Sequence, residues 1–88
     1  MITRNVTVLN RAGVHTRPAA AIVKIASEYR SDFYINKDGF QINGKSIIGV
    51  MTLAAAQGST LELSFDGPDE ELMAEAMTAY FAKGFEEM

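Results

Sequence analysis

Apolar and polar residues alternate with a period of two in four short stretches, a pattern typical of half-buried β-strands. The stretches cover residues 2–8, 33–36, 40–42 and 60–65. The pair Asp38-Gly39, between the second and third stretches, favours a tight hairpin turn. In the last stretch Leu61, Leu63 and Phe65 share one side, so we expect them to face the core.

Two segments between these strands carry a helical pattern. From Pro18 onward one face is apolar and Lys24 lies away from it, which predicts an amphipathic helix. The apolar face consists of Ala19, Ile22, Ile25, Ala26 and Tyr29. Ser46 precedes the apolar residues 47–53, so we expect a short helix that this serine caps.

A third helix is predicted after Gly67-Pro68, because the acidic residues 69–71 suit the positive end of a helix dipole. Gly84 is suited to end it. The predicted buried face is Met73, Ala76, Met77 and Tyr80. The order βαββαβα, with helices covering one face of a four-stranded sheet, predicts an α+β open-faced sandwich and leaves the strand order open.

Length, composition and charge narrow the class of protein further. Eighty-eight residues, 48% of them hydrophobic, are expected to form one domain over residues 1–88. A net charge of −3 argues against nucleic-acid binding, and the absence of cysteine excludes disulfides and thiolate chemistry. No apolar run approaches the ~20 residues that span a bilayer. We therefore expect a cytoplasmic protein without membrane insertion, metal or cofactor.

His15, the single histidine, lies at the predicted entrance to the first helix. One interpretation is that His15 only caps the helix. The other is a phosphoryl-accepting site, because free N–H groups near Thr16 and Arg17 attract anions and the Arg17 guanidinium can bind phosphate oxygens in a fork. A neutral imidazole can attack phosphorus, and Gly13 is expected to leave room for a large partner. We expect no second acid or base nearby, which favours a carrier over a hydrolase.

Two segments carry a resemblance to a known family. Residues 13–19, Gly-Val-His-Thr-Arg-Pro-Ala, resemble the phosphohistidine signature of the HPr family, the histidine-containing phosphocarriers of the bacterial phosphoenolpyruvate–sugar phosphotransferase system. Residues 44–53 resemble the second signature of that family, around its regulatory serine. The spacing of the two segments also matches, and the likeness covers essentially the whole chain.

The resemblance implies a four-stranded antiparallel sheet with three helices. It further implies that enzyme I phosphorylates His15 at Nδ1, that Arg17 assists, and that the phosphoryl group passes to enzyme II A components for sugar uptake. Two departures concern partner preference: Thr16 stands where alanine is common in the family, and Ile48 where methionine or phenylalanine is common.

The resemblance also gives Ser46 a second role, as the target of the HPr kinase/phosphorylase, beside its role as a helix cap. Part of the following apolar cluster should be exposed near His15 and dock partners. We expect a monomer that binds its partners through one surface. The expected docking residues are Thr16, Ala20, Lys24, Ile47, Ile48 and Met51.

Two other functions stay open at this point. An acylphosphatase-like hydrolase would need a phosphate-binding loop with an arginine and a group that positions water, and only the His15 region offers anything similar. A regulatory HPr paralogue, of a nitrogen branch or an incomplete phosphotransferase system, would carry the same motifs without serving sugar transport.

Overall fold

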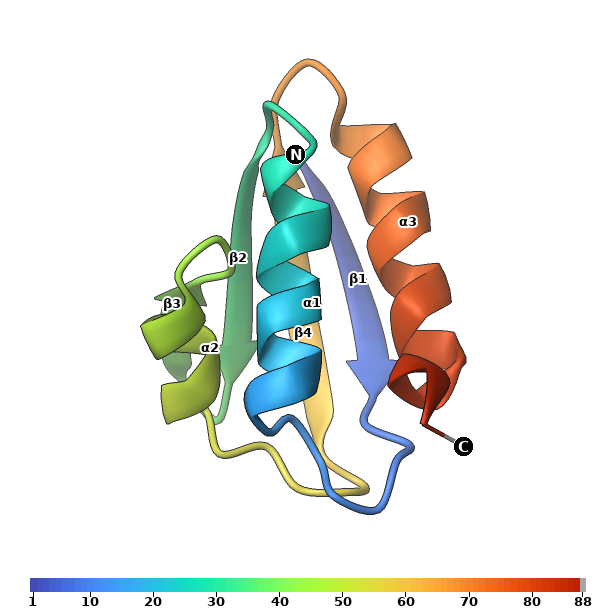
Figure 1. Ribbon diagram of the computed structural model, residues 1–88. Helices are drawn as coiled ribbons and strands as arrows, with labels where there is room; N and C mark the ends of the chain where they lie inside the picture. Colours follow the sequence, from blue (N-terminus) through green and yellow to red (C-terminus); the bar gives the residue numbers. More distant parts are fainter. Residues whose placement is uncertain (88) are drawn as a thin grey trace.

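The computed structural model describes residues 1–87 and contains the predicted elements in the predicted order (Figure 1). A short 3-10 helix, η1, follows the last α-helix. The elements are β1 (Ile2–Thr7), α1 (Thr16–Ser27), β2 (Asp32–Lys37), β3 (Phe40–Asn43), α2 (Ile47–Thr52), β4 (Thr60–Asp66), α3 (Glu70–Ala82) and η1 (Gly84–Glu86). None of the helices in the described part of the chain has the length and apolarity needed to span a membrane.

The four strands form one antiparallel sheet in the order β1-β4-β2-β3. The last strand in the sequence therefore lies in the middle, where Leu61 pairs with Val6 of β1 and Leu63 pairs with Ile35 of β2. The helices cover one face of this sheet (Figure 1). The predicted α+β open-faced sandwich is confirmed, and the structure supplies the strand order.

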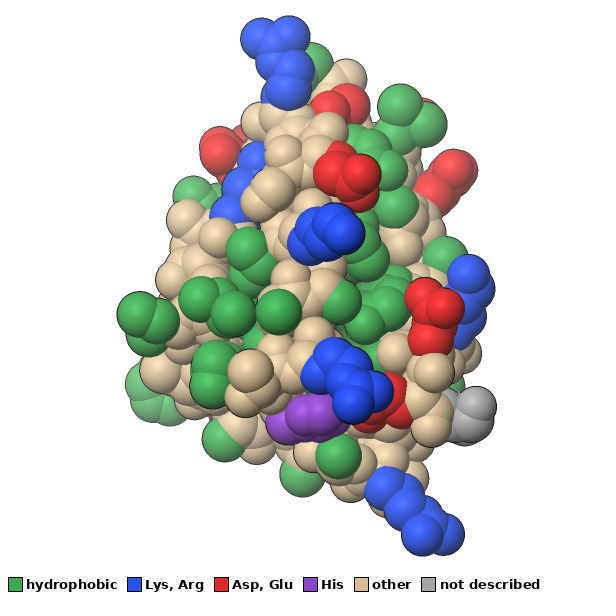
Figure 2. Space-filling view, viewed as in Figure 1, with side chains coloured by type: hydrophobic (Ala, Val, Ile, Leu, Met, Phe, Trp, Pro, Cys, Tyr) green, Lys and Arg blue, Asp and Glu red, His purple; other side chains and the backbone are tan. Residues whose placement is uncertain are grey.

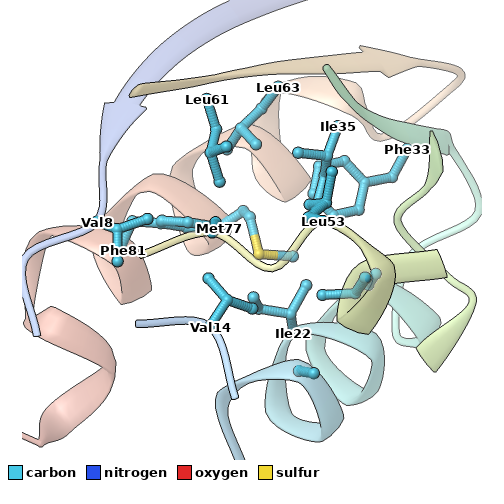
Figure 3. Packing of buried hydrophobic residues seen from close by; sticks show 14 of the residues in the cluster. Val8, Val14, Ile22, Phe33, Ile35, Leu53, Leu61, Leu63, Met77 and Phe81 are labelled. Carbon is cyan, nitrogen blue, oxygen red and sulfur yellow. The ribbon is translucent and has the colours of Figure 1, made fainter. Parts of the chain in front are cut away.

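The core lies between the sheet and the helices (Figure 3). Leu61, Leu63 and Phe65 of β4 are completely buried, as their alternation predicts. The Phe65 ring stacks on the ring of Phe33 with 5.0 Å between centroids. Helix α1 begins at Thr16, directly after His15 and with Pro18 in its first turn, and buries Ala19, Ile22 and Ala26 against the sheet.

Helix α3 turns a different face to the core from the one that the sequence predicts. The residues buried on this helix are Met73, Ala74, Met77 and Phe81. Ala76 and Tyr80 are only half-buried, so the prediction that they belong to the fully buried face is wrong, although Tyr80 still packs against the edge of the core. A phenolic hydroxyl needs water or a hydrogen-bond partner, whereas the Phe81 ring has no polar atom to satisfy, so phenylalanine suits the interior position better.

The two long helices are tied together at the end far from His15. Asp69, immediately before α3, accepts hydrogen bonds from the Arg30 N–H at 2.9 Å and from the Ser31 N–H at 2.9 Å. Its carboxylate also accepts the Ser31 hydroxyl at 2.6 Å. The Ser31 hydroxyl bond, followed by the Arg30 N–H bond, holds the pKa of Asp69 at about 2, below its ordinary 3.8.

We predict that Asp69→Asn lowers the Tm at pH 7 by weakening this tie between α1 and α3. Because the pKa of Asp69 is depressed in the folded chain, its carboxylate stabilises the fold fully above about pH 4. That stabilisation is lost as the pH falls toward 2, so the Tm difference between wild type and variant should shrink over this range. Thermal unfolding followed by circular dichroism at several pH values measures it. Asp32→Asn, the same change at an exposed strand position, is the control; an equal loss there would contradict the prediction.

Candidate functional site

His15 occupies the position just before α1, with an extended backbone at φ −95° and ψ −168°. Its side chain makes no capping hydrogen bond to the helix. The imidazole is 39% exposed at the end of the molecule where α1 starts, and the single purple side chain in Figure 2 shows it reaching the surface. Capping therefore does not account for this side chain.

A carboxylate lies against the imidazole. His15 Nε2 is 2.9 Å from Oε2 of Glu87 and 3.2 Å from Oε1. The same Oε1 accepts a hydrogen bond from Asn10 Nδ2 at 2.6 Å, and Asn10 Nδ2 also donates to the Gly13 carbonyl at 2.9 Å. The expectation that no second acid or base lies near His15 is wrong.

The surroundings of Glu87 keep its carboxyl group ionised. Burial by itself would raise the pKa of this group. The hydrogen bonds from Asn10 and His15, together with the nearby charges of His15 and Arg17, outweigh burial and lower the pKa below its ordinary value. Within residues 1–87 no group of three histidine, cysteine or acidic side chains is arranged to hold a metal ion.

The segment after α3 carries Glu87 to the site. Phe85 is buried, and its ring lies 4.9 Å from the Phe81 ring and 5.3 Å from the Tyr80 ring, measured between centroids. These contacts fix the chain just before Glu87. The sequence offers no signal for this role, because Glu87 is one of several acidic residues near the end of the chain and is 72 positions from His15.

The first turn of α1 offers hydrogen-bond donors beside His15. The Ala19 N–H bonds to the His15 carbonyl at 2.9 Å, whereas the N–H groups of Thr16 and Arg17 find no acceptor in the described part of the chain. Such free N–H groups at a helix start form an anion site. The Arg17 side chain is exposed, and its charge is near enough to help lower the pKa of Glu87.

Gly13 has a different role from the one that the sequence predicts. It is buried, with φ of +70°, and a Cβ there would overlap the carbonyl oxygen of Ala55. The neighbouring Val14 N–H donates to the same carbonyl at 2.9 Å. Glycine is therefore required by close approach of the chain to itself. The expectation that Gly13 leaves room for a partner is wrong.

The predicted docking residues lie on two helices that contact each other. Thr16, Ala20 and Lys24 follow one another at intervals of four along α1, and all three are exposed. On α2 the side chains of Ile47, Ile48 and Met51 are 40%, 73% and 43% exposed, respectively. Figure 2 shows apolar side chains gathered over α2, to the left of the Lys and Arg side chains that lie along α1.

Ser46 caps α2 as predicted. Its hydroxyl accepts the Gly49 N–H at 3.2 Å. The preceding residue, Lys45, reaches across to the end of α1, where its ammonium donates to the Tyr29 carbonyl at 2.8 Å. This bond helps to fix the start of α2 relative to α1, so the two exposed faces keep their mutual arrangement.

Comparisons with known proteins agree with this geometry. Residues 2–83 match the family described as PTS HPr component phosphorylation site. The chain is 49% identical over 87 residues to the phosphocarrier protein HPr of Treponema pallidum, covering 99% of each protein. The crystal structure of HPr-C-His from Thermoanaerobacter tengcongensis superposes with a TM-score of 0.96 at 36% identity, covering 100% of this chain and 99% of that one.

A second solved structure matches less closely. The crystal structure of Crh, the catabolite repression protein of Bacillus subtilis, is described as a dimer with a swapped domain. It matches with a TM-score of 0.77 at 37% identity, covering 96% of this chain and 97% of that one. The family match, the relatives along the full chain and the shared fold lead to one conclusion: the chain belongs to the HPr family of phosphocarrier proteins of the phosphotransferase system.

Proposed function

We propose that this protein accepts a phosphoryl group from phospho-enzyme I on His15 and passes it to enzyme II A components for sugar uptake. The observation that carries the proposal is the environment of His15: a partly exposed imidazole at a helix start, with Nε2 against Glu87. No hydrogen bond to Nδ1 is found within residues 1–87. The neutral imidazole that donates its Nε2 proton to a carboxylate presents a lone pair at Nδ1.

In the proposed reaction Nδ1 of His15 attacks phosphorus. The new N–P bond forms while the bond from phosphorus to the donor breaks, and the electron pair of that bond leaves with the donor. The free N–H groups of Thr16 and Arg17, together with the Arg17 guanidinium, stabilise the negative charge on the three phosphoryl oxygens. In the second half of the cycle an acceptor takes the group and His15 is regenerated.

The docking surface that we propose for these partners consists of the exposed faces of α1 and α2. Ile47, Ile48 and Met51 offer an apolar contact, and Lys24 with Arg17 offers positive charge to acidic partners. Because the patch is small, it favours complexes that form and dissociate quickly. We propose that the protein acts in the cytoplasm, and that one monomer suffices since all partners use this surface.

We also propose that an HPr kinase/phosphorylase modifies Ser46. The Ser46 hydroxyl is half-buried at the start of α2, directly before the exposed Ile47 and Ile48. A phosphoserine there carries about −1.5 to −2 charges at pH 7. That charge would lie beside the docking surface and repel acidic partners.

A second candidate is a regulatory HPr paralogue that does not serve sugar transport. The similarity to Crh, a protein named for catabolite repression, favours this alternative. Phosphoryl transfer from this protein to a sugar-specific enzyme II A component distinguishes the two functions. Family membership supports a carrier over the acylphosphatase-like hydrolase.

Phosphorylation of His15 tests the main proposal. With phosphoenolpyruvate and enzyme I, wild type should gain one phosphoryl group, which intact mass measures and which acid but not alkali removes. His15→Ala should gain none and keep its fold, because the side chain is at the surface. Acid-labile phosphorylation of the alanine variant would disprove the assignment.

Arg17→Ala should slow phosphoryl transfer about 100-fold or more while changing the affinity for enzyme I much less, since the guanidinium acts mainly on the moving phosphoryl group. Arg17→Lys should restore only part of the rate, because an ammonium lacks the planar fork. Rapid-quench kinetics and binding titrations separate the two effects. Equal losses in binding and transfer would make Arg17 a docking residue instead.

Ser46→Asp should slow phosphorylation of His15 by enzyme I, mainly by weakening association, and added salt should relieve part of the loss. Ser46→Ala is the matched control: it should accept phosphate normally and lose about 1 kcal/mol of stability with the cap. Transfer rates at low and high ionic strength measure the effect. A wild-type rate for Ser46→Asp at low ionic strength would leave Ser46 with the capping role alone.

A further inference from the structure

Glu87 is shielded from water, and no lysine or arginine side chain within residues 1–87 forms a salt bridge with it. Its side chain is only 16% exposed, whereas that of the adjacent Glu86 is exposed. A shielded carboxylate costs free energy unless hydrogen bonds replace its water. The side chains that donate to Glu87 are those of His15 and Asn10. The site therefore holds an ionised carboxylate against the imidazole by these two hydrogen bonds.

Asn10 holds Glu87 in place and has an unsatisfied atom of its own. Its side chain is 2% exposed, and the amide nitrogen donates to Gly13 and to Glu87. The amide oxygen is buried and has no hydrogen-bond partner in the described part of the chain. An unpaired buried acceptor is destabilising. The amide nitrogen offsets that cost by holding two acceptors, the Gly13 carbonyl of the loop and the Glu87 carboxylate.

The backbone before Glu87 is also strained. Gly84, Phe85 and Glu86 have φ values of 59°, 59° and 61°, in the left-handed region. Two of these three are not glycine, and such conformations persist only where surrounding contacts impose them. The packing of the Phe85 ring against Phe81 and Tyr80 supplies those contacts. Strain of this kind is concentrated at functional sites.

We propose that Glu87, held by Asn10, is the positioning residue for phosphoryl transfer at His15. It keeps the imidazole proton on Nε2, so that the lone pair is at Nδ1, and it stabilises the positive charge that the ring gains when the Nδ1–P bond forms. The proton stays on Nε2 throughout. This inference rests on the proposed function and adds to it a carboxylate that acts through the imidazole, as the aspartate does in a Ser-His-Asp triad.

The other charged groups around this pair are few. Arg17 on α1 lowers the pKa of Glu87. Arg11 lines the same surface hollow as Glu87. Burial, together with the charges of Glu86 and Glu87, raises the pKa of Tyr80 on α3, so the phenol stays neutral. Within residues 1–87 Glu87 is the carboxylate that contacts the imidazole.

A charge-neutralising pair of variants tests the proposal in full-length protein. Glu87→Gln keeps the size of the side chain and removes its charge, and Glu86→Gln makes the same change one residue away at an exposed position. We expect Glu87→Gln to lower the maximal rate of phosphorylation by enzyme I about 10- to 100-fold, the range found for carboxylates that orient metal-bound histidines. The KM for the carrier should change little. Glu86→Gln should behave as wild type.

The tautomer of His15 and its coupling to Asn10 separate positioning from a purely structural role. The NMR tautomer of His15 should change in Glu87→Gln but not in Glu86→Gln, because the glutamine amide has no charge to hold the proton on Nε2. A double-mutant cycle with Asn10→Ala should be non-additive, because Asn10 acts through Glu87. Circular dichroism and Tm values establish that each variant is folded.

Nitrogen-15 NMR of the unphosphorylated protein tests the contact without any transfer assay. The wild type and Glu86→Ala should show a protonated Nε2 and an unprotonated Nδ1, and Glu87→Ala should show a mixture of the two tautomers. The same maximal rate for Glu87→Gln and Glu86→Gln would overturn the inference, as would identical tautomers in the two alanine variants. A wild type that gains no phosphoryl group would instead refute the proposed function, and the NMR comparison would still decide whether Glu87 fixes the tautomer.

Discussion

Leu61, Leu63 and Phe65 project from the central strand β4 toward the helices, and burying them requires a cover that the sheet alone cannot provide. Helices α1 and α3 supply this cover, because both pack against the face of the sheet from which these three side chains project (Figures 1 and 3). The free energy of removing these side chains from water is the main favourable contribution to folding. It also fixes where each helix lies, and thereby where each connecting loop lies.

The site follows from that arrangement. β1 is antiparallel to β4, and α3 returns in the opposite direction to β4, so β1 and α3 run the same way. The loop after β1 and the segment after α3 therefore end at the same end of the molecule (Figure 1). His15 comes from the first and Glu87 from the second, which is how residues 72 positions apart come to be 2.9 Å apart.

Groups of opposite charge lie on different sides of the His15 imidazole. A carboxylate contacts Nε2, while the free N–H groups at the start of α1 and the charge of Arg17 are available to an anion. A carboxylate placed among those donors would compete with a phosphoryl group for them. Held by Asn10 against Nε2, it leaves them free. The imidazole can then contact the Glu87 carboxylate through Nε2 while Nδ1 stays available to a phosphoryl group.

Local features of the sequence determined the elements, the fold class and the position of His15. Alternation identified the buried face of β4, the Ser46 cap marked the start of α2, and the residues around His15 carried the family signature. These features depend on neighbours a few positions apart. The strand order, the close approach that requires Gly13, the buried Phe81 and the contact from Glu87 were decided only in the tertiary structure. Each depends on packing between distant segments, and local periodicity contains no information about which distant segments meet.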